Sequence, residues 1–235
     1  IENKNSNPDM AIDYLNQALL LEPNYWKLKN QLGAIYLGKG EWQKAVEAYQ
    51  SVVSLIPNET SGYVNLGNAY FFQAEFDKAA VAYQEALKFN EDDVALSNIA
   101  TMWFYHGDYS KAANYYLKAI KNTPKQYLYW LNLADTKDQS LEYKEEALSH
   151  YEYTLELAFE KLSKTPNDSD ARAVIAWCYA KTGKNSEAES NLLLAVSLSP
   201  KDPNILYLAA KTEAQIGNLA QAKIYLQQAI DTGFP

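Results

Sequence analysis

Side chains that could act as nucleophiles, general acids or metal ligands are sparse in this chain of 235 residues. There are two histidines, His106 and His150, and no histidine or cysteine lies at a metal-ligand spacing from either of them. The one cysteine, Cys178, stands between Trp177 and Tyr179, where it is expected to pack as a small apolar residue. We therefore predict no catalytic residue, no metal site and no cofactor, and we expect that the protein is not an enzyme.

Grouped carboxylates have a structural explanation in this sequence. One group is Glu91, Asp92 and Asp93, and another is Asp168 with Asp170. Both groups fall at expected turns or helix starts, where a negative charge interacts favourably with the helix dipole. The nine glycines are scattered along the chain and do not form a phosphate-binding loop.

The charge balance excludes one large class of partner. Lysine and arginine number 21 against 29 aspartates and glutamates, which gives a net charge of -8, so we expect no binding to the phosphates of nucleic acid. The longest apolar candidate, residues 10–21, is interrupted by polar side chains, so we expect no direct insertion into a membrane. A single cysteine leaves the redox compartment open. We expect a cytoplasmic location, with the periplasm as the alternative.

The sequence repeats with a period of about 34 residues. Gly33 and Gly67 are 34 apart, and each follows a leucine and precedes a tyrosine by three residues. Alanines keep nearly the same interval, as do tyrosines and prolines: Ala45, Ala79 and Ala112; Tyr49, Tyr83 and Tyr116; Pro23 and Pro57; Pro166 and Pro200. A fixed period in this range is typical of stacked repeats, so the period decides the architecture.

Each unit is predicted to be a pair of helices. Apolar residues follow the i, i+3, i+4, i+7 spacing in two blocks, and a short turn with glycine, such as Gly107 or Gly183, separates the blocks. A proline such as Pro57 stops the second helix. Alanine at position 45 and its equivalents lets the two helices approach closely.

This pattern of Leu-Gly, Tyr, Gly, Ala, Tyr, Ala and Pro resembles the tetratricopeptide repeat over nearly the whole chain. The resemblance implies an all-α fold, a right-handed superhelical solenoid of antiparallel helix hairpins. It also implies that the first helices line a concave groove that binds peptides or other proteins.

If this holds, a row of side-chain amides lies along the groove. Gln31, Asn65, Asn98 and Asn132 each precede a core aliphatic residue in consecutive units, where the resemblance implies contact with the backbone of an extended peptide. The alternative is that these amides stay solvated. Six further residues are expected to face the groove and to mix polar groups with aromatic anchors: Asn68, Phe72, Thr101, Tyr105, Asp135 and Trp177.

The whole chain is expected to be one repeat domain. Its predicted parts are a half repeat over residues 9–25 and repeats over 26–59, 60–92, 93–126, 127–168, 169–202 and 203–235. The unit 127–168 lacks a glycine turn and has a long apolar-periodic run, which predicts a second helix extended by about two turns.

The sequence is compatible with two functions and one further property. The first function is a non-catalytic scaffold that binds a peptide or protein segment in the groove. The second is a regulatory or sensory region of a larger signalling protein (a kinase, cyclase or transcription regulator) that binds a small effector or a domain of its own chain. It rests on the extended unit and the C-terminal end, which are similar to repeat regions of bacterial multidomain kinases and transcription regulators. Neither end has an obvious polar cap, which predicts a fragment of a longer chain, with residues 3–7 as a linker, and leaves self-association through the ends as a further possibility.

Overall fold

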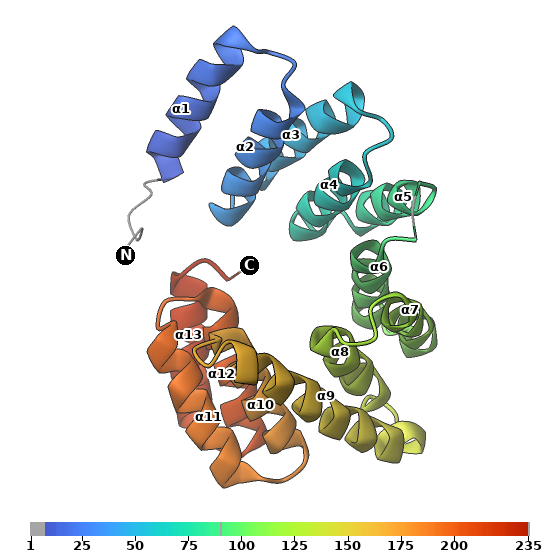
Figure 1. Ribbon diagram of the computed structural model, residues 1–235. Helices are drawn as coiled ribbons and strands as arrows, with labels where there is room; N and C mark the ends of the chain where they lie inside the picture. The colour runs from blue at the N-terminus through green and yellow to red at the C-terminus, as the bar shows by residue number, and fades with distance from the viewer. Residues whose placement is uncertain (1–7, 90, 235) are drawn as a thin grey trace. The chain divides into compact units, whose positions relative to one another are not determined.

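The computed structural model describes residues 8–89 and 91–234, and the predicted linker at residues 3–7 lies outside them. Within these residues the regular structure is entirely helical (Figure 1). The elements are α1 (Pro8–Leu21), α2 (Trp26–Gly38), α3 (Trp42–Leu55), α4 (Thr60–Phe72), α5 (Phe76–Leu87), α6 (Asp93–Tyr105), α7 (Tyr109–Asn122), α8 (Tyr127–Lys137), the 3₁₀ turn η1 (Leu141–Tyr143), α9 (Lys144–Lys164), α10 (Ser169–Lys181), α11 (Asn185–Leu198), α12 (Pro203–Gln215) and α13 (Leu219–Asp231). The predicted all-α fold of helix hairpins is confirmed.

The chain forms two compact units, one up to Met102 and one from Trp103, and the boundary falls inside α6. In the first unit, α2 with α3 and α4 with α5 form hairpins, and α3 also packs on α4. The helices follow one another as a stack of hairpins (Figure 1). The leading α1 lies against α2 but has no buried residue, so it contributes little to the core of this unit.

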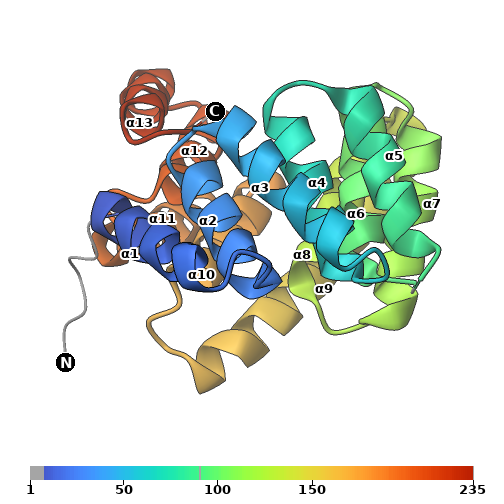
Figure 2. The ribbon, with the colours of Figure 1, turned by 90° about the horizontal axis from the view of Figure 1, so that it is seen from above.

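The second unit contains the hairpins α8–α9, α10–α11 and α12–α13, and α7 packs on α8. Its helix α9 has 21 residues, whereas the second helices α3, α5, α7, α11 and α13 have 12–14. The short η1 stands before α9, at the place where the sequence has no glycine turn. Figure 2 shows the long α9 beside α8 and α10 in a second view.

Most hairpin turns contain a residue in the left-handed conformation, whereas the described residues of the α8–α9 turn include none. Gly40, Gly107, Gly183 and Gly217 have φ between 73° and 96°, as their place after each first helix predicted. The equivalent residue of the α4–α5 turn is Ala74, which takes φ 59° without being a glycine. An L side chain is strained in this conformation, so the turn carries a local cost.

Acidic residues cap several of the helices. Asp92 accepts a hydrogen bond from the backbone N–H of Ala95 at 2.8 Å, and Asp168 accepts one from that of Ala171 at 2.9 Å. Such caps satisfy backbone donors that the first turn of a helix leaves open. The grouped carboxylates at these two positions therefore have the structural role that their sequence context predicted.

The core of the first unit depends on tyrosines that pack against glycines. Tyr49 and Tyr83 are 2% and 1% exposed, and their rings lie over Gly33 and Gly67 of the preceding first helices. A Cβ on Gly67 would stand 2.4 Å from the Tyr83 ring. Because non-bonded carbon atoms do not come so close, the glycine is needed for this approach of the two helices.

Replacing Gly67 by alanine is expected to lower the free energy of unfolding by about 1–3 kcal/mol, since the Tyr83 ring must move. The matched control is Gly38→Ala in α2, where nothing lies within 4 Å of the added Cβ. That change removes a flexible residue from a helix and is expected to add about 0.5–1 kcal/mol. Urea unfolding followed by circular dichroism measures both, and equal effects of the two substitutions would refute the packing argument.

Replacing Ala74 by glycine is expected to raise the free energy of unfolding by about 0.5–1 kcal/mol, because glycine adopts positive φ without a steric cost. The same substitution at Ala214, an exposed position in α12, is expected to lower it by a similar amount. Thermal and urea unfolding of the two variants give the signs directly. A loss of stability in Ala74→Gly would show that the left-handed alanine is not strained.

Candidate functional site

The amide row of the first unit links neighbouring first helices. The side-chain N–H of Asn65 in α4 donates to the side-chain oxygen of Asn30 in α2 at 2.9 Å. Asn98 in α6 donates in the same way to Asn68 in α4 at 2.8 Å. All four amides are half-buried, so the row forms part of the contact between repeats and also remains in reach of solvent.

Tyr83 supports this row from the second helix of its hairpin. Its hydroxyl donates to the side-chain oxygen of Asn68 at 2.8 Å. Burial raises the pKa of Tyr83 well above its ordinary value, so the phenol stays protonated and remains a donor. The same tyrosine therefore fills the space over Gly67 and orients the amide of Asn68.

In the second unit, charged and aromatic residues take the place that Asn68 has in α4. Asp135 in α8, Trp177 in α10 and Lys211 in α12 occupy the same place in three consecutive first helices. The carboxylate of Asp135 accepts hydrogen bonds from the indole N–H of Trp177 at 2.8 Å and the hydroxyl of Tyr151 at 2.6 Å. The ammonium of Lys211 lies 3.4 Å from its other oxygen. One carboxylate thus joins α8, α9, α10 and α12.

Lysines flank the indole ring of Trp177. The ammonium of Lys211 lies 4.3 Å from the ring centroid and that of Lys181 lies 5.2 Å from it, both within range of a cation–π interaction. Lys181 also pairs with Asp138. Burial and the carboxylate of Asp135 raise the pKa of Tyr151 far above its ordinary value, so its hydroxyl keeps the proton that it donates.

The predicted site residues fall into two groups. Hydrogen bonds tie Asn65, Asn68 and Asn98 into the first unit, and Asp135 and Trp177 into the second. Among the others, Gln31 is exposed, Asn132 is half-buried and Tyr105 is 65% exposed. Phe72 is half-buried, with its ring edge-on to that of Phe71. Thr101 donates its hydroxyl to the carbonyl of Ser97 at 3.0 Å.

Trp177, which the sequence predicts to be an apolar anchor facing the groove, is mostly buried in the structure. It is 7% exposed, and its indole N–H is bonded to Asp135. The reason is that Lys181, Lys211 and Asp135 lie around the indole ring and, with other neighbours, shield it from solvent. Tyr105 is the exposed aromatic residue of this unit among those predicted to act as anchors.

Sequence reasoning missed three residues that hold these rows together, namely Asn30, Tyr151 and Lys211. Lys211 lies 34 residues after Trp177, so the repeat period alone could have found it. Tyr151 belongs to the series of repeat tyrosines, but the irregular unit hid its register. Asn30 stands one residue before the predicted row, and only the packing of α2 against α4 shows its contact with Asn65.

Burial and packing explain the positions of the cysteine and of one of the two histidines. Cys178 is fully buried, and burial raises the pKa of its thiol well above the ordinary value, which disfavours the reactive thiolate. The ring of His150 lies 5.4 Å from that of Trp130, and burial lowers the pKa of this histidine. Among residues 8–89 and 91–234, no three His, Cys, Asp or Glu side chains are grouped so that they could hold a metal ion. No helix in the same ranges is both long and apolar enough to cross a bilayer.

Replacing Asp135 by alanine is expected to lower the free energy of unfolding by about 2–4 kcal/mol, because the buried donors of Tyr151 and Trp177 lose their acceptor. Tyr151→Phe removes only one donor and is expected to cost about 0.5–1.5 kcal/mol. Asp13→Ala, at an exposed carboxylate of α1, is the control and should stay within about 0.5 kcal/mol. If urea unfolding shows that Asp135→Ala loses no more free energy of unfolding than Asp13→Ala, the structural role of the Asp135 carboxylate is contradicted.

Comparison with known proteins identifies the repeat. Family models described as tetratricopeptide repeat match residues 4–60, 61–93, 104–136, 169–202 and 203–232. No curated protein matches the chain. Among solved structures, similarity extends to the Cut9–Hcn1 hetero-tetramer of the APC/C (15% identity, TM-score 0.69, 97% of this chain and 44% of that one) and to the human IFIT1 dimer with PPP-AAAA (16%, 0.67, 96% and 55%).

A third similar structure is that of Pseudomonas aeruginosa pilF, with 18% identity and a TM-score of 0.57, covering 88% of this chain and 91% of that one. At these identities the likeness concerns the fold. The chain spans about half the length of the Cut9 and IFIT1 chains. The family models together cover most of the sequence, so the chain belongs to the tetratricopeptide repeat family.

Proposed function

We propose that this chain is a protein–protein interaction scaffold whose first helices bind an extended segment of a protein partner. The membership of the tetratricopeptide repeat family supports the scaffold function. The observation that carries the finer proposal is the amide row of Asn65 and Asn98, placed at the same position of consecutive first helices and half-buried.

The amides have hydrogen-bonding capacity to spare. Asn65 and Asn98 each donate one N–H to a neighbouring amide, at 2.9 Å and 2.8 Å. A primary amide has a second N–H and an oxygen with two lone pairs. A peptide backbone presents N–H and C=O groups at regular intervals, so it complements such a row without any demand on the peptide's side chains. The bonds between the amides also fix their orientation before binding, which reduces the entropic cost of association.

Side chains next to the amides would add apolar contact. In the first unit, Phe72 lies one turn beyond Asn68 on α4, and Gln31 extends the row onto α2. Thr101 adds a hydroxyl on α6. In the second unit, Tyr105 is the exposed ring and Asn132 the amide, while Asp135 and Trp177 hold the helices beneath them. Exposed aromatic residues are enriched among those that dominate binding energy.

The chemistry of the chain limits the proposal to protein partners. A net charge of -8 opposes association with nucleic acid, and no catalytic step is part of the proposed function. No observation in the geometry or the comparisons favours the alternative of a sensory region in a signalling protein.

The test uses a phage-displayed library of unstructured peptides panned on the whole chain. Affinities of selected peptides are then measured by fluorescence anisotropy. Asn65→Ala with Asn98→Ala is expected to weaken binding about 10-fold to 100-fold, from the loss of two hydrogen bonds to the peptide backbone. Gln84→Ala with Asn114→Ala, which removes exposed amides from the second helices α5 and α7, is the matched control and should leave the affinity unchanged.

Circular dichroism and unfolding midpoints must first show that both double variants are folded. Selected peptides that bind the Asn65 and Asn98 variant as tightly as the unchanged chain would refute the role of the amide row. Peptides whose binding is lost in the Gln84 and Asn114 variant would place the site on the second helices.

A further inference from the structure

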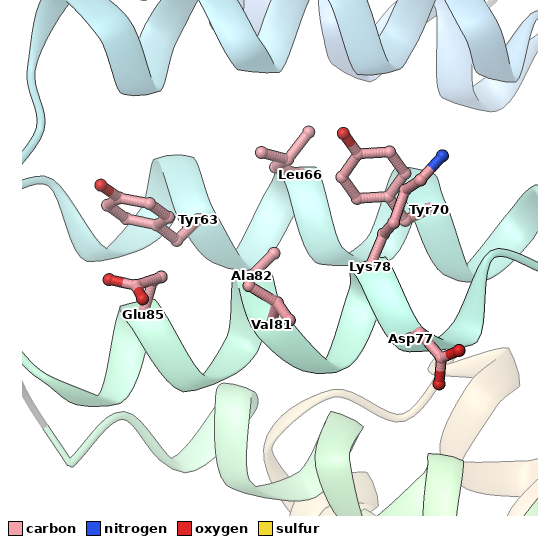
Figure 3. Close-up of a pocket in the computed structure, with 8 residues that line it drawn as sticks. All are labelled: Tyr63, Leu66, Tyr70, Asp77, Lys78, Val81, Ala82 and Glu85. Atoms are coloured by element: carbon pink, nitrogen blue, oxygen red, sulfur yellow. The ribbon is translucent and has the colours of Figure 1, made fainter.

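An apolar pocket of the first unit is lined by none of the residues of the amide row. It has a volume of about 380 Å³ and is lined by α4 and α5. Its residues are Tyr63, Leu66 and Tyr70 from α4, and Asp77, Lys78, Val81, Ala82 and Glu85 from α5. Figure 3 shows these side chains along the two adjacent helices, with Tyr63 and Glu85 at one end and Tyr70, Lys78 and Asp77 at the other.

The floor and walls of this pocket are fixed by contacts within the unit. Leu66 belongs to the buried core, and Ala82 is 5% exposed. The Tyr70 hydroxyl accepts a hydrogen bond from Gln50 of α3 at 2.8 Å, and the Tyr63 ring stacks on that of Phe89 with centroids 5.8 Å apart. Both tyrosines are thus held in place, and the pocket is formed before any ligand binds. Its volume falls within the range that is usual for binding pockets.

Val81 differs in side-chain type from most residues at the same repeat position of the other second helices. It is 58% exposed, although an aliphatic side chain gains from burial. The equivalent residues of α3, α7, α9 and α11 are all polar and exposed: Glu47, Asn114, Ser149 and Ser190. The final helix α13 is the one other with an aliphatic residue here, Ile224. Nothing in the hairpin requires an aliphatic residue at this place, since four repeats form the same hairpin without one.

The charges beside Val81 specify the kind of partner. Asp77, Val81 and Glu85 lie at i, i+4 and i+8 on α5, so they form one stripe about 12 Å long on the helix surface. Asp77 has no side-chain hydrogen bond or ion pair with any residue that the structure describes, and Glu85 pairs only with Lys88 one turn away, at 2.5 Å. Such exposed pairs are weak and readily exchanged.

The one lysine of the lining also has a carboxylate partner. Lys78 lies 3.3 Å from Glu75 and 5.7 Å from the centroid of the Tyr70 ring. The lining therefore holds two carboxylates, Asp77 and Glu85, against one lysine, so the apolar slot lies between groups of net negative charge.

From this arrangement we infer that the α4–α5 pocket is a second docking site, which binds an amphipathic helix of a protein partner through an aliphatic or aromatic side chain flanked by two basic residues. The apolar side chain enters between Leu66 and Val81, and the basic residues meet Asp77 and Glu85. A helix with basic residues four positions before and after its apolar residue matches the stripe on α5 in length and in charge. This site does not depend on the amide row.

The experiment uses a yeast-displayed library of helical peptides, selected on the whole chain and counter-selected on the Val81→Ser variant. This substitution introduces the residue type that α9 and α11 carry at the same position, so the hairpin is expected to fold. Val94→Ser, at a 45% exposed valine of α6 outside the pocket, is the matched control. Enriched peptides are expected to carry Leu, Ile, Met or Phe between two Lys or Arg residues.

The affinity of one selected synthetic peptide is then measured by fluorescence anisotropy at two salt concentrations. Val81→Ser is expected to weaken binding about tenfold, as for the loss of one buried aliphatic contact. Asp77→Asn with Glu85→Gln is expected to weaken it about threefold to tenfold and to reduce its dependence on salt. Neither Val94→Ser nor the Asn65→Ala and Asn98→Ala double variant should change the affinity, and the latter separates this site from the proposed groove.

Three results would overturn the inference. One is a selection in which no peptide discriminates between the unchanged chain and Val81→Ser. Another is enrichment of acidic peptides at this pocket, which would contradict the charge argument. The third is a dimer of the chain, seen by analytical ultracentrifugation without peptide, that Val81→Ser dissociates, because a second copy would then occupy the pocket.

Discussion

The fit of a tyrosine into the space over a glycine sets the geometry of the first unit. Tyr49 and Tyr83 are almost completely buried, and the first helices opposite them have no side chain at Gly33 and Gly67. Each ring fills its space fully, so the distance between the two helices of a hairpin has little freedom. Other contacts of the unit, including those of the amides, follow from that fixed distance.

Buried side chains of the second helices also control the polar side chains of the first helices. In the first unit, the hydroxyl of Tyr83 reaches Asn68, and in the second unit, that of Tyr151 reaches Asp135. Both tyrosines keep their protons because burial raises their pKa values. The same repeat position therefore carries out packing and hydrogen bonding, and the polar partner changes from an amide to a carboxylate between the units.

The two candidate binding surfaces of the first unit offer different chemistry. The row of Asn65 and Asn98 is polar and suited to a peptide backbone, whereas the pocket around Val81 is apolar with carboxylates at its edge. A backbone-reading row has little sequence preference, while a pocket for one side chain discriminates by size and charge. A scaffold with both surfaces would combine a general contact with a selective one.

The sequence alone determined the repeat, the helix pairs and the turn glycines, because a period of 34 residues and the helical spacing are local properties of the chain. It also predicted that Asn65 and Asn98 occupy equivalent places. Only the tertiary structure showed that these amides bond to Asn30 and Asn68, that Trp177 is buried, and that Val81 lies beside a pocket. Those features depend on which side chains of neighbouring helices meet, and that is decided by packing distances of a few ångströms that a repeat pattern does not specify.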